Sequence, residues 1–377
     1  MEYRSLPHGG EKISILGLGT SSIQASDEKE IEETIRLAAE NGINYFDMAS
    51  SEAKPFPAYG RALAGYREKV YFQIHFGANY ETGTYGWTVN LDTIKRSIDW
   101  QISALKTDYI DFGFIHCIDE AADLHMVQEA GIIRYIEELK SQGVVRHIGL
   151  SSHSPALVNE VLDMNILDML MFSINPSYDY AGSDRADYEA GSYAVGSYAV
   201  GGVGERMDLY RRCEAEGVGI SVMKAFSGGQ LLNEKTSPFR KKLTEYQCIQ
   251  YALDKPGVLT VLPGIRGRAD LQRILGFCQA GEEEKDYSVI GTFAPQDAEG
   301  HCVYCNHCAP CPAGLNVGLI NKYYDLSMAG DKLAHDHYDK LEMKAGQCIG
   351  RGHCNNRCPF HVDQAARMKM ISDYFGY

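Results

Sequence analysis

The sequence lacks an excess of positive charge. Its 377 residues carry 36 Lys and Arg against 50 Asp and Glu, which gives a formal net charge of −14 at pH 7. No basic cluster offsets this charge, and a negative surface repels the phosphates of nucleic acids and the head groups of anionic lipids. Neither nucleic acid nor a membrane surface is therefore an expected partner.

Long apolar runs are also missing. No stretch approaches the ~20 apolar residues that a membrane-spanning helix needs. The first residues, MEYRSLPHGGEK, lack the apolar centre of a secretory signal peptide. Hydrophobic residues at 45% and charged residues at 23% are typical of a soluble globular protein. The sequence predicts a cytoplasmic location.

Cysteines are few in the first 301 residues and closely spaced after them. Seven of the eleven cysteines fall within residues 302–358. Tightly spaced cysteines in a cytosolic chain favour a metal site over disulfides. This shift in composition predicts two domains, one over residues 1–285 and one over residues 286–377.

The first of these domains alternates short apolar runs with helical patterns. Eight strand candidates occur, at residues 13–18, 43–48, 70–77, 109–117, 147–152, 170–175, 219–225 and 259–264. Alternation predicts parallel strands, and eight such units in this length predict an α/β fold of the (β/α)₈ TIM-barrel type. An open doubly wound sheet is disfavoured, because the early glycine-rich turn, LGLGTSS, lacks a third glycine.

Polar residues recur where these strands end, and the active sites of such barrels lie at the C-terminal ends of the strands. The residues at these ends are Asp47, His75, His116, Ser151, Ser152, Asn175 and Lys224. Two insertions follow strands on the same face, at residues 78–89 and 176–204. The second is long and contains several tyrosines, and we interpret it as a loop that covers the substrate.

Several motifs in residues 1–280 resemble the aldo-keto reductase family. In order, they are ISILGLGT, NYFDMAS with a following AYG, DYIDFGFIH, VMKAFSGG and LPG. The resemblance implies that a tyrosine donates a proton to a carbonyl that receives hydride from NADPH. It implies that Tyr59 is this acid, that Asp47 supports it, and that His116 orients the substrate oxygen.

The chain departs from the family pattern at the remaining catalytic position. The family has a lysine where the third strand ends, and here the residue is His75. Histidine changes charge between about pH 5 and 8 and can act as a general acid or base. A proton-transfer role for His75, and activity that depends on pH near neutrality, are therefore expected.

The cofactor side departs as well. The family's nicotinamide-binding glutamine is replaced by Met171, although Asn175 is kept, and its adenine-binding Glu-Asn pair is replaced by Arg273 and Ile274. Other side chains at the barrel mouth could still hold phosphates, namely Ser151, Lys224, Ser227, Arg266 and Arg268. Binding of NADP(H) is left open.

The cysteine-rich tail resembles a ferredoxin module with two clusters. It reads CVYCNHCAPCP and then CIGRGHCNNRCP, close to the bacterial C-x₂-C-x₂-C-x₃-C-P run. The crossed pairing of that module assigns one complete [4Fe–4S] cluster to Cys302, Cys305, Cys308 and Cys358. The second site keeps Cys311, Cys348 and Cys354.

Arg351 stands where the fourth cysteine of that second site belongs. The site could therefore hold a [3Fe–4S] cluster, a [4Fe–4S] cluster with another ligand such as His353, or nothing. A structural zinc site is the rival, but seven cysteines exceed one tetrahedral site and zinc sites seldom end in Cys-Pro.

The resulting prediction is an iron–sulfur oxidoreductase on an aldo-keto-reductase-like barrel. It would interconvert a carbonyl and an alcohol on a small polar metabolite, with electrons passing through the clusters. A ferredoxin or another electron-transfer protein could exchange electrons with the tail. The alternative is a non-redox lyase, isomerase or dehydratase with structural clusters. The third hypothesis is an electron-transfer or cluster-bearing adaptor protein whose barrel is catalytically inactive.

Overall fold

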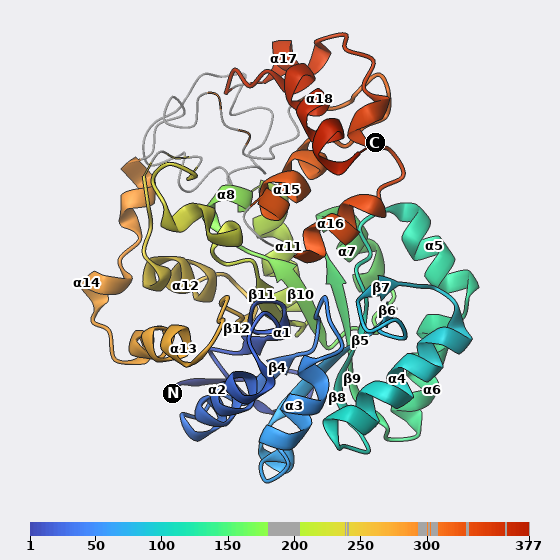
Figure 1. Cartoon of the computed structure of the whole chain (residues 1–377), viewed down its shortest axis with the longest axis vertical. Helices are drawn as coiled ribbons and strands as arrows, with labels where there is room; N and C mark the ends of the chain where they lie inside the picture. The colour runs from blue at the N-terminus through green and yellow to red at the C-terminus, as the bar shows by residue number, and fades with distance from the viewer. Residues whose placement is uncertain are drawn as a thin grey trace. The chain divides into compact units, whose positions relative to one another are not determined.

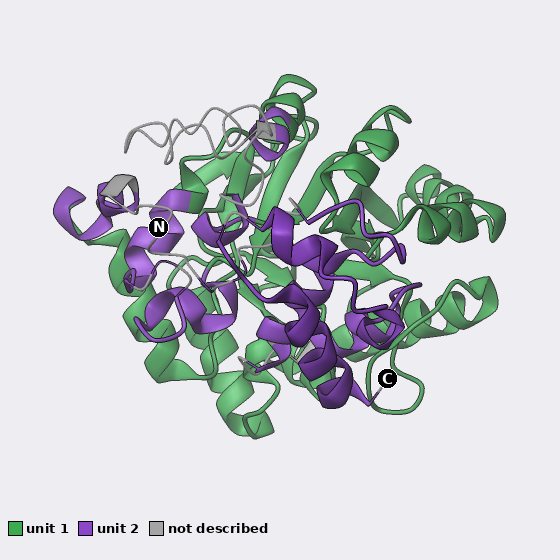
Figure 2. Cartoon of the chain, turned by 90° about the horizontal axis from the view of Figure 1, so that it is seen from above, with its two compact units in different colours: residues 1–173, 209–225, 252–281 green, residues 174–208, 226–251, 282–377 purple. Residues whose placement is uncertain are grey.

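The chain folds into two compact units (Figure 2). The computed structural model describes residues 1–179, 204–237, 239, 241–292, 300, 302, 308–328, 332–358 and 360–376. Unit 1 comprises residues 1–173, 209–225 and 252–281; unit 2 comprises residues 174–208, 226–251 and 282–377. The boundary at residue 285 stays a prediction, since unit 2 also takes in two segments from the first 285 residues.

Unit 1 contains the predicted eight parallel strands, arranged around a common centre (Figure 1). They are β3 (Leu18–Gly19), β4 (Tyr45–Asp47), β5 (Tyr71–Phe76), β8 (Ile110–Ile115), β9 (Val145–Ser152), β10 (Met169–Ser173), β11 (Gly219–Met223) and β12 (Val258–Val261). Each strand pairs with the next in chain order, and a parallel bridge between Leu16 and Val261 joins the first edge to the last. The sheet thus closes as a (β/α)₈ barrel.

The connections of unit 1 are mostly helical, and α2, α3, α4 and α6 lie outside the strands (Figure 1). The helices are α1 (Thr20–Ile23), α2 (Glu28–Glu40), α3 (Pro55–Ala62), η1 (Arg67–Lys69), α4 (Leu91–Leu105), α5 (Ala121–Glu129), α6 (Ile132–Ser141), α7 (Pro155–Leu162), α13 (Arg268–Leu275) and η4 (Gly276–Cys278). Side-chain caps fix where some begin: Asp27 accepts a hydrogen bond from the Glu30 amide, and Asn90 from the Thr93 amide.

The sequence predicted one strand over residues 13–18, but the structure has two short strands there. Lys12–Ser14 (β2) pairs antiparallel with Tyr3–Ser5 (β1) across a tight turn. The chain then enters the barrel, where the Gly17 amide donates to the Val261 carbonyl. Periodicity cannot separate a hairpin from a barrel strand when the two follow each other without a break in hydrophobicity.

The two insertions differ in how much of them the structure describes. Residues 78–89 contain a short hairpin, β6 (Ala78–Asn79) with β7 (Gly86–Trp87). Of residues 176–204, the structure describes α8 (Pro176–Asp179) and the start of α11 (Gly204–Ala215). The predicted covering loop, residues 180–203, lies outside the described residues.

Unit 2 is built from helices in its described part. They are α8, η3 (Ser227–Leu232), α14 (Glu282–Lys285), η5 (Ser288–Thr292), α15 (Val317–Met328), α16 (Lys332–Asp339), η7 (Ala345–Gln347), α17 (His353–Arg357) and α18 (Gln364–Phe375). Two further helices, α11 and α12 (Glu245–Leu253), have residues in both units. The ferredoxin-like character of residues 286–377 stays a prediction.

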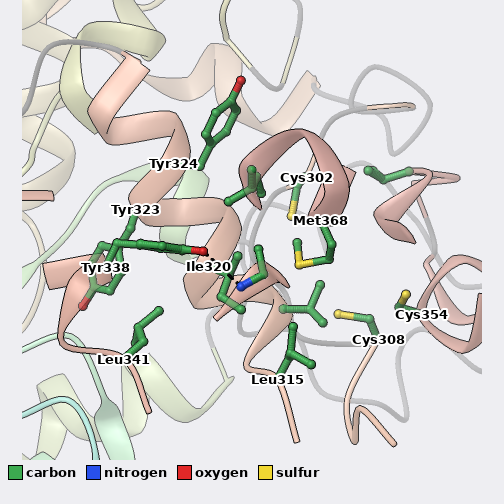
Figure 3. Packing of buried hydrophobic residues seen from close by; sticks show 14 of the residues in the cluster. Cys302, Cys308, Leu315, Ile320, Tyr323, Tyr324, Tyr338, Leu341, Cys354 and Met368 are labelled. Carbon is green, nitrogen blue, oxygen red and sulfur yellow. Dashed lines mark hydrogen bonds between the residues drawn. The ribbon is translucent and has the colours of Figure 1, made fainter. Parts of the chain in front are cut away.

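The core of unit 2 combines aromatic side chains with cysteines (Figure 3). Tyr323 and Tyr338 are fully buried, and the Tyr338 ring stacks on Phe375 with 3.7 Å between ring centroids. The sulfur atoms of Cys302 and Cys308 lie in the same cluster, beside Met368 (Figure 3). Within the part of the chain that the structure describes, no helix is long and apolar enough to cross a membrane.

A buried charge pair near the N-terminal ends of the strands makes stability depend on pH. Burial by itself lowers the pKa of His147, but hydrogen bonds to Asp168 and Glu11 outweigh it and raise the pKa above 6.5. Burial by itself raises the pKa of Asp168, but hydrogen bonds from His147 and Lys140 bring it well below 3.8. The histidine therefore stabilises the fold below pH 6.5 and loses that effect as the pH rises; the aspartate stabilises it above pH 3.8.

We expect the melting temperature to be highest between about pH 4 and 6.5, and to fall on either side of that window. The measurement is thermal unfolding of the wild type and of His147→Gln at pH 5.5 and pH 8.5. The difference in melting temperature between the two pH values should shrink in the variant. An equal difference in both proteins would contradict the assignment to His147.

Candidate functional site

Three of the predicted catalytic side chains form a hydrogen-bonded chain inside unit 1. His75 Nε2 lies 2.7 Å from Asp47 Oδ1, and His75 Nδ1 lies 2.9 Å from His116 Nδ1. All three residues are buried, with at most 4% of their surface exposed. They sit at the C-terminal ends of β4, β5 and β8, which is the catalytic end of a (β/α)₈ barrel.

Strand geometry explains why these side chains meet. Residues two apart on a strand point to the same face. His75 therefore shares a face with Gln73, whose Nε2 donates to Asp47 Oδ1 at 2.9 Å. The side-chain oxygen of Gln73, Oε1, accepts hydrogen bonds from the hydroxyls of Tyr45 at 2.6 Å and Ser221 at 3.1 Å. These two bonds fix the amide so that its NH₂ group faces Asp47.

A fourth side chain continues this series of hydrogen bonds, and it was not predicted from the sequence. Tyr85, in the β6–β7 hairpin, places its hydroxyl 2.9 Å from His116 Nε2. Trp87 of the same hairpin donates its indole N–H to the His116 carbonyl at 3.2 Å. The signal available in the sequence was the aromatic YGW within the insertion at residues 78–89, which gave no indication of contact with a particular histidine.

Backbone bonds hold the hairpin in this position. The Tyr85 amide donates to the Ser51 carbonyl at 3.0 Å, and the Ala53 amide donates to the Gly83 carbonyl at 2.9 Å. The hairpin is thus attached to the loop that follows β4, the strand that carries Asp47. Gly77, which connects β5 to the hairpin, has φ +119°, a conformation that side chains disfavour.

Tyr59, the predicted acid, lies outside this chain of hydrogen bonds. It is in α3, is fully buried and packs edge-on against Phe46. Its hydroxyl has no hydrogen-bond partner among the described residues. Burial, and then the nearby charge of Asp47, raise the pKa of Tyr59 well above its usual value. The next residue, Gly60, lets α3 approach α4, because a Cβ there would lie 2.3 Å from the Ala104 carbonyl oxygen.

The two buried tyrosines give a test of these contacts. Tyr45→Phe leaves one of the Gln73 hydrogen bonds unmade, and we expect it to lower the free energy of unfolding by about 1–3 kcal/mol. Tyr59→Phe removes a hydroxyl that has no hydrogen-bond partner among the described residues. The free energy of unfolding should therefore fall by less than about 1 kcal/mol, or rise. Denaturant titration of both variants measures the difference. A larger loss in Tyr59→Phe than in Tyr45→Phe would show that the Tyr59 hydroxyl is hydrogen-bonded.

A second polar group lies at other strand ends of unit 1. His153 Nδ1 is 2.9 Å from Asp119 Oδ2, and Lys224 Nζ is 3.0 Å from His153 Nε2. Lys224, and Cys117 after β8, both have positive φ angles, which non-glycine residues seldom adopt outside functional sites and tight turns. The carboxylate holds the imidazole, and the imidazole holds the Lys224 ammonium. Neither Asp119 nor His153 was predicted.

The predicted phosphate-binding arginines already have partners. Arg266 Nε contacts Asp270 Oδ2 at 2.9 Å, and Arg268 pairs with Glu30 at 2.8 Å and Glu33 at 2.5 Å. These carboxylates offset the positive charge before any phosphate arrives. Both guanidinium groups nevertheless remain exposed, so a role for the two arginines in binding phosphate stays a prediction.

The other predicted cofactor-binding residues are divided between the units. Ser151 is buried in β9 of unit 1, and Lys224 follows β11 in the same unit and is half-buried, whereas Asn175 and Ser227 lie in unit 2. The Asn175 side chain accepts a hydrogen bond from the Tyr178 amide at 3.1 Å. In place of the family's glutamine, Met171 presents its sulfur to Gln73 Nε2 at 3.0 Å. A dinucleotide role for these four predicted residues stays a prediction.

The tail cysteines gather in unit 2, where those that the structure describes form no disulfide. Cys302, Cys308, Cys354 and Cys358 are buried, Cys311 and Cys348 are half-buried, and Cys305 lies outside the described residues. The Val362 amide donates to the Cys358 sulfur at 3.4 Å. His353, next to Cys354, has a buried Nε2 without a hydrogen-bond partner among the described residues.

Neighbouring thiols raise one another's pKa. Burial raises the pKa of Cys308 to about 12, and the charges of Cys302, Cys358 and Cys354 add to the rise. Burial also raises the pKa of Cys354, with further contributions from Cys348 and Cys311. A raised pKa means that these thiols do not lose their protons readily. A bound metal ion would stabilise them as thiolates, because metals bind the deprotonated form.

Part of the barrel is similar to known proteins. Residues 15–189 match the model of the Aldo/keto reductase family. An aldo-keto reductase of Bacillus halodurans shares the fold, with a TM-score of 0.59 and 22% identity over 78% of this chain and 96% of its own. At this identity, the likeness to the solved structure shows a shared barrel fold.

Curated relatives match less than half of this chain. The Bacillus subtilis oxidoreductase YqkF is 30% identical over 178 residues, 45% of this chain and 56% of its own length. The L-galactose dehydrogenase of Arabidopsis thaliana is 27% identical over 43% of this chain and 52% of its own. The L-glyceraldehyde 3-phosphate reductase of Escherichia coli is 23% identical over 44% and 49%. The chain thus spans about half the length of these relatives, all of which are named as oxidoreductases, dehydrogenases or reductases.

Proposed function

We propose that the protein is an oxidoreductase that interconverts a carbonyl and an alcohol on a small polar metabolite. One observation carries this proposal: a chain of Asp47, His75 and His116 lies at the catalytic end of an aldo-keto reductase barrel. Reduction of a carbonyl consumes two electrons and two protons, one of which goes to the oxygen. An imidazole chain that begins at a carboxylate is suited to deliver that proton. The sugars named for two relatives support a small polar substrate.

Each residue of this site in unit 1 has its own role in the proposed reaction. Asp47 holds His75 through Nε2, and the Gln73 amide keeps the carboxylate in place. His116 takes or gives a proton at Nδ1 and faces outward through Nε2. The buried setting excludes bulk water from the chain, so protons move along it and not to solvent. Lys224 could hold an anionic group of the substrate at the neighbouring strand ends.

The electrons are proposed to pass through the cysteine-rich tail. The residues fit an iron–sulfur group: their thiols are buried and grouped, and an amide already donates to the Cys358 sulfur. Cys302, Cys305, Cys308 and Cys358 would hold a complete [4Fe–4S] cluster, and Cys311, Cys348 and Cys354 the incomplete site. Such clusters supply one-electron transfer. A ferredoxin or another electron-transfer protein is the proposed partner.

The test uses full-length protein purified without oxygen. DL-glyceraldehyde is supplied with dithionite-reduced methyl viologen, with NADPH or with NADH, and alcohol formation is measured by chromatography. We expect turnover with the viologen, and no preference for NADPH over NADH because Arg266 and Arg268 are paired with carboxylates. Strong preference for NADPH would refute the electron route through the tail. No reduction with any donor would refute the carbonyl–alcohol reaction for this substrate class.

A non-redox reaction is the second candidate, favoured by the two adjacent imidazoles of His75 and His116. A base and an acid joined by one hydrogen bond suit proton abstraction and return, as in an isomerase or dehydratase. The same assay decides between the two. Conversion of glyceraldehyde to dihydroxyacetone without any electron donor would support the non-redox reaction.

A further inference from the structure

We propose that Tyr85, and not Tyr59, gives the proton to the substrate oxygen, and that His75 supplies that proton through His116. This inference rests on the proposed carbonyl–alcohol reaction and adds a catalytic residue that the family resemblance does not contain. The observation behind it is a continuous line of three hydrogen bonds from Asp47 to the Tyr85 hydroxyl, of 2.7, 2.9 and 2.9 Å.

The exposed fractions of the four side chains indicate which end of this line of hydrogen bonds the substrate meets. Asp47, His75 and His116 are 4%, 1% and 4% exposed, whereas Tyr85 is only half-buried. A substrate that reaches the strand ends therefore meets the tyrosine before the histidines. Tyr59, by contrast, is fully buried and shares no hydrogen bond with the line.

The pairing of ring nitrogens restricts where protons can be. Between the two Nδ1 atoms there is room for one proton, so one imidazole donates and the other accepts. When both rings are neutral, His75 Nε2–H donates to Asp47 and His116 Nδ1–H donates to His75. His116 Nε2 then accepts the proton of the Tyr85 hydroxyl. One extra proton on His75 reverses the line, so that His116 Nε2–H donates to the Tyr85 oxygen.

The proton transfer follows from this reversal. In reduction, the electron donor supplies two electrons in one-electron steps, and a proton from water bonds to carbon. The Tyr85 O–H bond breaks, and its proton bonds to the substrate oxygen. The tyrosine oxygen takes the His116 Nε2 proton, and His116 Nδ1 takes the His75 Nδ1 proton. His75 ends neutral, still donating to the Asp47 carboxylate. Oxidation of the alcohol runs through the same bonds in reverse, and charge balances in both directions.

Turnover of tyrosine variants is the first measurement, with DL-glyceraldehyde and reduced methyl viologen as probe. Tyr85→Phe should lower kcat about 10²–10⁴-fold with little change in KM, which is the usual effect of losing a general acid. Tyr135→Phe, at a half-buried tyrosine of α6, is the matched control and should match the wild type. Near-normal turnover of Tyr85→Phe, or a larger loss in Tyr59→Phe, would overturn the assignment to Tyr85.

A second measurement does not depend on activity. The ¹⁵N signals of imidazole nitrogens distinguish a protonated nitrogen from one that carries a lone pair. In protein labelled at histidine, Tyr85→Phe should move the His116 Nε2 signal, whereas Tyr59→Phe should leave it in place. An unmoved signal in Tyr85→Phe would refute the contact. If the wild type reduces no carbonyl but this signal moves, the proposed reaction fails and the hydrogen-bonded line stands.

Discussion

Replacing His75 with lysine is expected to lower turnover about 100-fold and to remove the dependence of turnover on pH that proton transfer through His75 causes. Lysine is the residue that the aldo-keto reductase resemblance would place there. Its ammonium has three donors and no acceptor, so it can pair with Asp47 but cannot receive and pass on the His116 proton. The line to Tyr85 would be interrupted at its second member.

The direction of the pH effect follows from the proton that is moved. Reduction consumes a proton from His75, so the wild-type reduction rate should fall as the pH rises, and the oxidation rate should rise. The groups that face His75 are Asp47 from β4, Gln73 from β5, and Phe114 and His116 from β8 and its end. Apart from His75 itself, only Asp47 and His116 among these four can titrate.

The measurement is a pH–rate profile of the wild type and His75→Lys in both directions. His125→Lys is the matched control, because His125 is exposed on α5 and pairs only with Glu129 among the described side chains. It should keep the wild-type profile. A flat wild-type profile, or an unchanged profile in His75→Lys, would contradict proton transfer through His75.

Iron and acid-labile sulfide are expected in protein purified without oxygen, with visible absorbance that dithionite bleaches. Cys358→Ser should remove about four irons per chain, because Cys358 and Cys308 are ligands of the proposed complete cluster. Cys311→Ser should leave those four irons and affect only the site near Cys354. Loss of the first cluster should also lower the melting temperature, since these thiols are part of the core of unit 2.

Two further variants make the iron experiment specific. Cys248→Ser, at a buried cysteine of α12, is the control and should keep the full iron content. Arg351→Cys restores the cysteine that the ferredoxin pattern expects, and should raise the iron content if the second site is incomplete. Stoichiometric zinc without sulfide would refute the ferredoxin resemblance.

The sequence by itself determined the barrel and the members of its buried site. Eight apolar runs of strand length, separated by helical patterns, leave few arrangements other than a closed parallel sheet. Because parallel strands end on one side, Asp47, His75 and His116 could be placed together without coordinates. The run at residues 13–18 was wrong as a single strand, since a hairpin strand and a barrel strand follow each other there with no polar residue between them.

Only the tertiary structure decided which side chains touch. Tyr85 reaches His116 because backbone bonds tie its hairpin to the loop after β4, and no local pattern encodes such a contact between distant segments. The same holds for His153 with Asp119 and Lys224, and for the carboxylates that pair with Arg266 and Arg268. Strand periodicity fixes the face on which a residue lies, whereas hydrogen bonds between distant segments depend on how loops pack, and that is a property of the whole fold.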